Sequence, residues 1–233
     1  MPGYILHLTE ATMIIKELKQ EGYPCPAEWC NAFLLGNLLP DTKIKKAKIT
    51  SHFWNPEDLK YQAIAPDLSL FLEKYGTKLQ GPLMLGYLSH LYLDACFVNS
   101  FWDSMWEFLD GENHPEILQE KIRFVHLKQK NQWIPVSDFF SSEYYYGDYS
   151  RMNAYLLHKY KPSVPVFDPA LTCPITEVHM EDLHMVLGEL QHLCDTLHPG
   201  AEEQLAVFDL PSLEAFISET ALQMSLLLME KYL

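Results

Sequence analysis

The stretch from Gly81 to Trp102, GPLMLGYLSHLYLDACFVNSFW, is almost wholly apolar and most constrains the fold of this chain. It has a proline near its start and no later helix breaker, which predicts a buried helix. Two polar residues, His90 and Asp94, are spaced i and i+4 and so share one helix face. An unpaired buried carboxylate is costly, and no Lys or Arg occurs between Lys78 and Lys121. Asp94 therefore needs a cationic partner from another segment or a metal ion.

Helical periodicity dominates the rest of the chain, and β-type alternation is nearly absent. Glycine and proline residues between the periodic stretches indicate where helices end. We expect an all-α fold, a single domain over residues 1–233 with about seven to nine helices around the long central one. The main expected helices are Thr9–Glu21, Ala27–Leu38, Pro66–Tyr75, Gly81–Leu109, His114–Lys130, Asp148–Lys161, Glu177–Leu197 and Leu213–Leu233.

The chain is acidic, with 31 Asp and Glu residues, 17 Lys and Arg residues and a formal net charge of −14. Non-specific nucleic-acid binding depends on Lys and Arg, so this charge argues against a general nucleic-acid surface. A phosphoester substrate stays compatible, because metal ions or other cations concentrated in a pocket could bind it. No apolar run reaches the length of about 18 residues that a transmembrane segment needs.

The first residues and the cysteines indicate the compartment. The N-terminal stretch has no basic region and no small-residue cleavage site, so we expect no signal peptide. The five cysteines are an odd number without CxxC spacing, which is typical of reduced thiols. We therefore expect a cytoplasmic protein.

Five His and Asp residues lie in apolar or tightly structured surroundings within the first 94 residues. They are His7, Asp41, His52, His90 and Asp94. Three imidazoles and two carboxylates suit a pair of zinc ions or of other divalent transition metals. A shared carboxylate would hold two ions about 3.5–4 Å apart, the separation used to bind a phosphoester oxygen and activate water. The alternative is that His90 and Asp94 form a hydrogen-bonded pair in the core.

The motifs MPGYILHL, LLGNLLPDT, SHF and GYLSHLYLD resemble, in this order, the zinc-dependent phospholipase C family. This family is all-α and includes the zinc nucleases that act on single strands. The resemblance covers about the first 100 residues, where several short motifs in order are more specific than any one of them. It implies that the five residues just named are zinc ligands.

The chain departs from the family in two places. It begins Met-Pro, where secreted members use the amine of an N-terminal Trp as a ligand. The family's downstream HxxxE pair has no copy. His179, His184 and His192 are followed four residues later by Leu183, Gly188 and Thr196, and not by a glutamate. We therefore expect two zinc ions, and a third is left open.

The resemblance implies a metal-dependent phosphoester hydrolase. Asp41, His52 and His90 would hold one ion, Asp94 would bridge or hold the second, and His7 would complete that second site. The family's base matches Asp41, which makes Asp41 the candidate catalytic residue. The substrate would be a small phosphoester or a phospholipid-like molecule. The alternative is a non-catalytic helical member that acts as a binding protein, with structural His and Asp residues.

Two weaker candidates lie later in the chain. Asp148, in GDYSRMNAYL, could be an extra ligand or a substrate contact, but its position also predicts an N-cap. His184 and His192 share a helix face near Glu181 and could form a second metal patch. Such histidine patterns also arise by chance in an acidic, histidine-containing helix. A structural role is therefore favoured for Asp148, and a chance pattern for His184 and His192.

Overall fold

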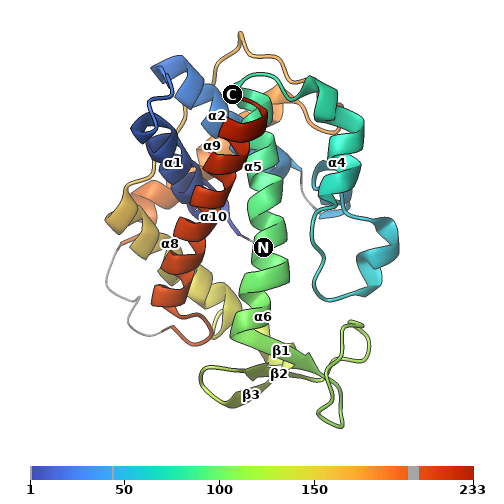
Figure 1. The fold of residues 1–233 in the computed structure, drawn as a ribbon. Helices are drawn as coiled ribbons and strands as arrows, with labels where there is room; N and C mark the ends of the chain where they lie inside the picture. The colour runs from blue at the N-terminus through green and yellow to red at the C-terminus, as the bar shows by residue number, and fades with distance from the viewer. Residues whose placement is uncertain (1, 44, 199–204) are drawn as a thin grey trace.

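The computed structural model describes residues 2–43, 45–198 and 205–233 of the chain (Figure 1). The structure is mostly helical, as predicted, and its helices pack around one continuous hydrophobic core. The α-helices are α1 (Tyr4–Gln20), α2 (Ala27–Leu38), α3 (Lys48–Ser51), α4 (Leu68–Tyr75), α5 (Pro82–Cys96), α6 (Trp102–Met105), α7 (Val136–Phe139), α8 (Tyr145–Tyr160), α9 (Leu183–Thr196) and α10 (Leu210–Lys231). The strands are β1 (Trp106–Leu109), β2 (Phe124–Leu127) and β3 (Gln132–Pro135).

Helices α2 and α5 meet backbone to backbone at two glycines. A Cβ atom on Gly86 of α5 would lie 2.0 Å from the carbonyl oxygen of Phe33, and one on Gly36 of α2 would lie 2.0 Å from that of Leu83. Only a residue without a Cβ atom permits such an approach. Helix α2 therefore occupies the space beside Gly86, which lies one helical turn before His90.

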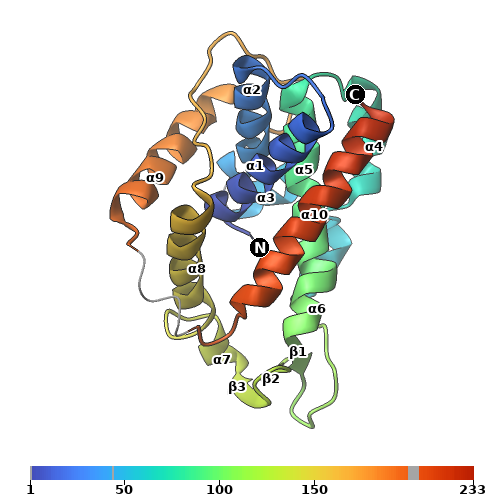
Figure 2. The ribbon, with the colours of Figure 1, turned by 60° about the vertical axis from the view of Figure 1, so that its left-hand side comes forward.

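Helix α1 contacts α2, α8 and α10 (Figure 2). It begins at Tyr4, earlier than the predicted Thr9, so His7 lies inside the helix and not before it. The early start is favourable because the added turn carries Ile5, Leu6 and Leu8, which are all buried. The N–H groups of Leu6 and His7 donate to the carbonyl oxygen of Gly3.

The all-α expectation is wrong for the segment that follows the central helix. Helix α5 ends at Cys96, a π-helical turn covers Phe97–Phe101, and α6 ends at Met105. The three strands then form an antiparallel sheet of order β1-β2-β3, which lies at one end of the molecule below α6 (Figure 1). Strand β1 replaces the expected end of the central helix, and β2 lies where a helix over His114–Lys130 was predicted.

The strands are too short for their alternation to stand out in the sequence. Each has four residues, and each places one or two side chains in the interior. Residues with positive φ lie in both connections, Asn113 with φ of 64° and Asn131 with φ of 49°. Asparagine is one of the few residues that tolerate this conformation, so the two turns are compatible with their sequences.

The C-terminal helices are close to their predicted positions, with shifted ends. Helix α8 begins at Tyr145, before the predicted Asp148, and α9 begins at Leu183, well after the predicted Glu177. Helix α10 begins at Leu210, where the Asp209 carboxylate accepts a hydrogen bond from the backbone N–H of Ser212 at 2.9 Å.

The α2–α5 contact predicts the effect of a single added methyl group. We expect Gly86→Ala to lower the free energy of unfolding by about 2–3 kcal/mol, because the new Cβ must push two backbones apart. Urea denaturation followed by circular dichroism measures this change. Gly188→Ala in α9 is the matched control, since nothing lies within 4 Å of its Cβ position. The control should be neutral or stabilise the protein by up to about 1 kcal/mol; equal effects in both variants would contradict the proposed contact.

Candidate metal centre

Four segments bring the five predicted residues together. His7 lies on α1, Asp41 in the 3-10 turn Leu39–Thr42 that continues α2, His52 directly after α3, and His90 and Asp94 on α5. All five are between 0 and 3 % exposed. They form two groups whose ligand atoms all lie within 4.8 Å of one another. One group is His7, His90 and Asp94, and the other is Asp41, His52 and His90.

Asp94 is at the middle of the arrangement. Its Oδ1 lies 3.4 Å from Nε2 of His7, while its Oδ2 lies 3.6 Å from Nε2 of both His52 and His90. The two Nε2 atoms of His52 and His90 are 3.3 Å apart, and Nε2 of His52 is also 3.4 Å from Oδ1 of Asp41. The two oxygens of Asp94 thus face different imidazoles, as a bridging carboxylate does.

These distances fit ligands around a shared ion better than direct hydrogen bonds. Neither oxygen of Asp94 and neither ring nitrogen of His7 makes a hydrogen bond within the described residues. Buried polar atoms without partners are rare and need an explanation. Two ligand atoms about 2.0–2.1 Å from one zinc ion at a tetrahedral angle lie about 3.3–3.4 Å apart. The observed separations between the candidate ligand atoms are therefore close to the ligand-to-ligand distances of a zinc site.

The other nitrogens of two imidazoles are held by neighbouring groups. Nδ1 of His90 lies 2.8 Å from the carbonyl oxygen of Asn37 and donates to it, which leaves the Nε2 lone pair facing the centre. Nδ1 of His52 lies 3.0 Å from Oγ of Ser51. Ser51 Oγ in turn donates to the carbonyl oxygen of Pro40 at 2.8 Å. Outer hydrogen bonds of this kind orient histidine ligands in metalloproteins.

Burial and charge set the protonation states at the centre. Burial, with a contribution from His7, lowers the pKa of His90 to about 3, so His90 is neutral at pH 7. Burial alone would raise the pKa of Asp41, but the contact with His52 and the charge of Lys48 hold it well below its usual range. The pKa of Asp94 is also lowered, because its interactions with His90 and His7 outweigh its burial. Neutral imidazoles and ionised carboxylates are the forms that bind metals.

Asp148, the candidate extra ligand, lies in a different environment. It is fully buried within α8, and its carboxylate accepts hydrogen bonds from the backbone N–H groups of Ala206, Val207 and Phe208 and pairs with Arg151 at 2.7 Å. It is not the N-cap of the helix, which begins three residues earlier. No group of candidate ligands in the described residues includes Asp148. Its contacts fix the segment before α10 onto α8.

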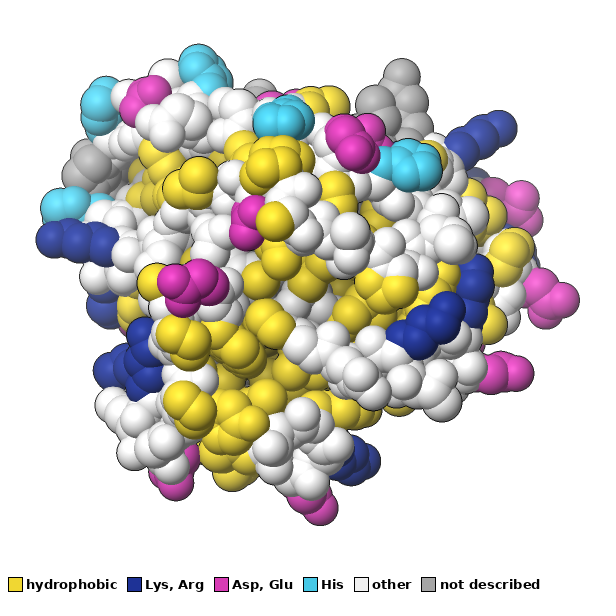
Figure 3. Space-filling view, turned by 90° about the horizontal axis from the view of Figure 1, so that it is seen from above, with side chains coloured by type: hydrophobic (Ala, Val, Ile, Leu, Met, Phe, Trp, Pro, Cys, Tyr) yellow, Lys and Arg dark blue, Asp and Glu magenta, His cyan; other side chains and the backbone are white. Residues whose placement is uncertain are grey.

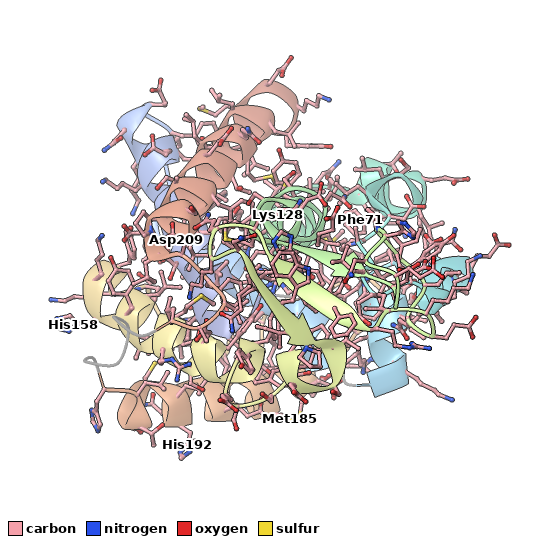
Figure 4. The ribbon with its side chains drawn as sticks, turned by 90° about the horizontal axis from the view of Figure 1, so that it is seen from below. Phe71, Lys128, His158, Met185, His192 and Asp209 are labelled. Atoms are coloured by element: carbon pink, nitrogen blue, oxygen red, sulfur yellow. The ribbon has the colours of Figure 1, made fainter. Side chains whose placement is uncertain are left out.

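The second candidate patch on α9 is not assembled. His184 packs its ring against Phe167, with centroids 4.0 Å apart. His192 points outward from α9 into solvent (Figure 4). Neither belongs to a candidate metal group within the described residues. Histidines that Figure 3 shows at the surface are therefore distinct from the three buried ones.

The sequence analysis did not predict two residues near the centre, Lys48 and Glu10. Lys48 donates from Nζ to Oδ1 of Asp41 at 2.5 Å. Its position four residues before His52 in KITSH was the available signal, but the basic run around it favoured a solvated loop. Glu10 lies one turn after His7 and is fully buried, and burial raises its pKa to about 8. Its Oε2 accepts a hydrogen bond from Ser89 at 3.1 Å.

Comparisons of the chain with models of protein families, with curated proteins and with solved structures found no match. In the part of the chain that the structure describes, no helix is both long and apolar enough to cross a membrane.

A metal ion at the centre should stabilise the folded protein. We expect zinc at about 100 times its dissociation constant to raise the melting temperature of chelator-treated protein by about 5–10 °C, because it binds the folded form. Asp94→Asn should abolish most of this shift, since it removes the carboxylate that faces three imidazoles. Differential scanning fluorimetry with and without zinc measures both. An equal shift in the variant would contradict the assignment of Asp94.

The contacts of Asp148 predict a structural effect without loss of metal. Asp148→Ala should lower the free energy of unfolding by at least about 3 kcal/mol, because buried backbone N–H groups and Arg151 lose their acceptor. The exposed Asp138 offers a control, and Asp138→Ala should stay within about 0.5 kcal/mol of the wild type. Zinc content at a temperature where the variant is folded should equal that of the wild type. If the folded variant lost zinc at that temperature, Asp148 would again be a candidate metal ligand.

Proposed function

We propose that the chain is a metal-dependent phosphoester hydrolase that holds zinc at the centre formed by His7, Asp41, His52, His90 and Asp94. The observation that carries the proposal is the convergence of these five buried side chains, in which neither oxygen of Asp94 has a hydrogen bond from the described residues. The order of the sequence motifs, which resembles the zinc-dependent phospholipase C family, supports the same activity. The mostly helical fold is compatible with it.

The five residues would have two roles, binding the metal ions and orienting water. His52 and His90 offer their Nε2 lone pairs, Asp41 completes their group, and Asp94 joins it to His7. A divalent ion held there would supply Lewis acidity, which activates water and offsets the charge of a phosphoryl group. Asp41 is the candidate base. Its low pKa keeps it ionised at neutral pH, so it can orient a water molecule and accept a hydrogen bond from it.

The substrate class proposed is a small phosphoester or a phospholipid-like molecule. The formal net charge of −14 argues against a general nucleic-acid surface. At the centre itself, the positive charge would come from the bound ions and from Lys48, which contacts Asp41. The two candidate groups overlap at His90, so its Nε2 could bind only one of the two expected zinc ions.

A second function is favoured by one observation, the burial of the five residues. The carboxylates and imidazoles are almost inaccessible to solvent, which is typical of structural metal sites that only stabilise a fold. In that case the chain would be a non-catalytic helical protein that binds a partner. Metal content alone does not separate the two functions, but metal-dependent hydrolysis does.

The test is metal content and hydrolysis measured on the same preparations. Untagged protein purified without chelator should contain zinc by plasma mass spectrometry, and His90→Ala should lose it, because His90 belongs to both candidate groups. His192→Ala, which removes an exposed histidine of α9, is the control and should keep the wild-type zinc content. Hydrolysis of p-nitrophenyl phosphate and bis(p-nitrophenyl) phosphate should fall at least about 100-fold in His90→Ala and Asp41→Asn.

The outcomes distinguish the alternatives. Absence of metal from the wild-type protein after reconstitution with zinc or manganese would contradict any metal centre. Bound metal without hydrolysis of any phosphoester in a broad screen would favour the structural site. Circular dichroism should show that both variants keep the helical signal, so that a loss of activity reports on the centre.

A further inference from the structure

Lys48 is the cation that touches the candidate centre. Its Nζ lies 2.5 Å from Oδ1 of Asp41, the same oxygen that lies 3.4 Å from Nε2 of His52. Among the described side chains, no other lysine or arginine forms an ion pair with any of the five candidate ligands. Lys48 is therefore part of the local charge arrangement.

The short helix α3 places Lys48 relative to His52. The backbone N–H of His52 donates to the carbonyl oxygen of Lys48 at 2.9 Å, so the two residues are one helical turn apart. The turn is tied to the rest of the centre at Ser51, whose carbonyl oxygen accepts a hydrogen bond from Tyr87 of α5 at 2.6 Å. Lys48 thus starts from a backbone that is fixed against the helix that carries His90 and Asp94.

The Lys48 ammonium lies at the boundary between the centre and solvent. Its side chain is 29 % exposed, whereas that of Asp41 is 4 % exposed. A lysine ammonium has three N–H donors, and Asp41 uses one of them. The remaining donors can bind a second anion without breaking the contact with Asp41.

The charge of Lys48 adds to that of the expected ions. Asp41 and Asp94 together contribute two negative charges, which one of the two expected divalent ions offsets. His90 can give a nitrogen to only one ion at a time, because its Nδ1 donates to the carbonyl oxygen of Asn37. A fixed ammonium beside the ligands adds the positive charge that a phosphoryl group with two or more anionic oxygens requires.

We propose that Lys48 binds a phosphoryl oxygen of the substrate at the mouth of the metal centre. This inference depends on the proposed phosphoester hydrolase function and deepens it, because it assigns a substrate-binding residue. Lys48 stays hydrogen-bonded to Asp41 and directs a second N–H group to the anion. The ligand class is an anionic phosphate group, which inorganic phosphate represents as a probe.

The experiment compares Lys48→Met with Lys46→Met, both reconstituted with zinc. Lys46 lies two residues earlier and is exposed, so its variant removes the same charge from the same segment without touching Asp41. Zinc per chain is measured by plasma mass spectrometry, and the affinity for inorganic phosphate by isothermal titration calorimetry. We expect Lys48→Met to keep the wild-type zinc content and to bind phosphate about tenfold or more weakly. Lys46→Met should match the wild type in both, and Lys48→Arg should recover part of the affinity.

Three results would overturn the proposal. Unchanged phosphate affinity in Lys48→Met would show that Lys48 does not bind the anion. Loss of zinc in step with loss of phosphate affinity would show that Lys48 only positions Asp41. If the wild-type protein holds no zinc, the hydrolase function itself fails and this proposal fails with it. A zinc-loaded wild type whose phosphate affinity is independent of Lys48 refutes the present proposal alone.

Discussion

The close contact between α2 and α5 is the constraint on which the candidate centre depends. Gly36 and Gly86 bring the two backbones together, and the carbonyl oxygen of Asn37 then reaches Nδ1 of His90. Asp41 follows directly at the end of α2. The same contact therefore fixes the ring of His90 and the approach of Asp41. If the helices were farther apart by the thickness of a methyl group, the distance from the Asn37 carbonyl oxygen to His90 would increase. Asp41 would also move away from His90, because the backbone of α2 determines both positions.

Burial of so many polar groups raises the question of what stabilises them. Two ionised carboxylates in an apolar interior cost several kcal/mol each unless they are paired and hydrogen-bonded. Asp41 is paired with Lys48, but the ion-pair contacts of Asp94 within the described part of the chain are imidazoles at 3.4–3.6 Å, and His90 is neutral at pH 7. A divalent ion would offset the charge of Asp94 and use the lone pairs that face it. This is a stronger argument for a metal than the residue types alone.

The sequence predicted the helical part of this arrangement because its causes are local. The i, i+4 spacing of His90 and Asp94 is enough to place both on one face, and α2 has the predicted bounds. The sheet could not be predicted, because no glycine or proline separates β1 from the central helix, and its pairing with β2 is set by contacts across a 14-residue loop that spans residues 110–123. Lys48 was missed for a similar reason, since its contact with Asp41 depends on how the turn before His52 folds back against α2.

The position of Lys48 also bears on how a buried centre could act on a substrate. The five candidate ligands are inaccessible, so a substrate that reaches them has to displace or pass a group at the boundary. Lys48 is such a group, and the long flexible stem of a lysine allows its ammonium to move while α3 stays in place. A neutral side chain there would not attract a phosphate, and an acidic one would repel it. The ammonium instead attracts the anion and already contacts Asp41, which links the arrival of the substrate to the carboxylate that the proposed reaction uses.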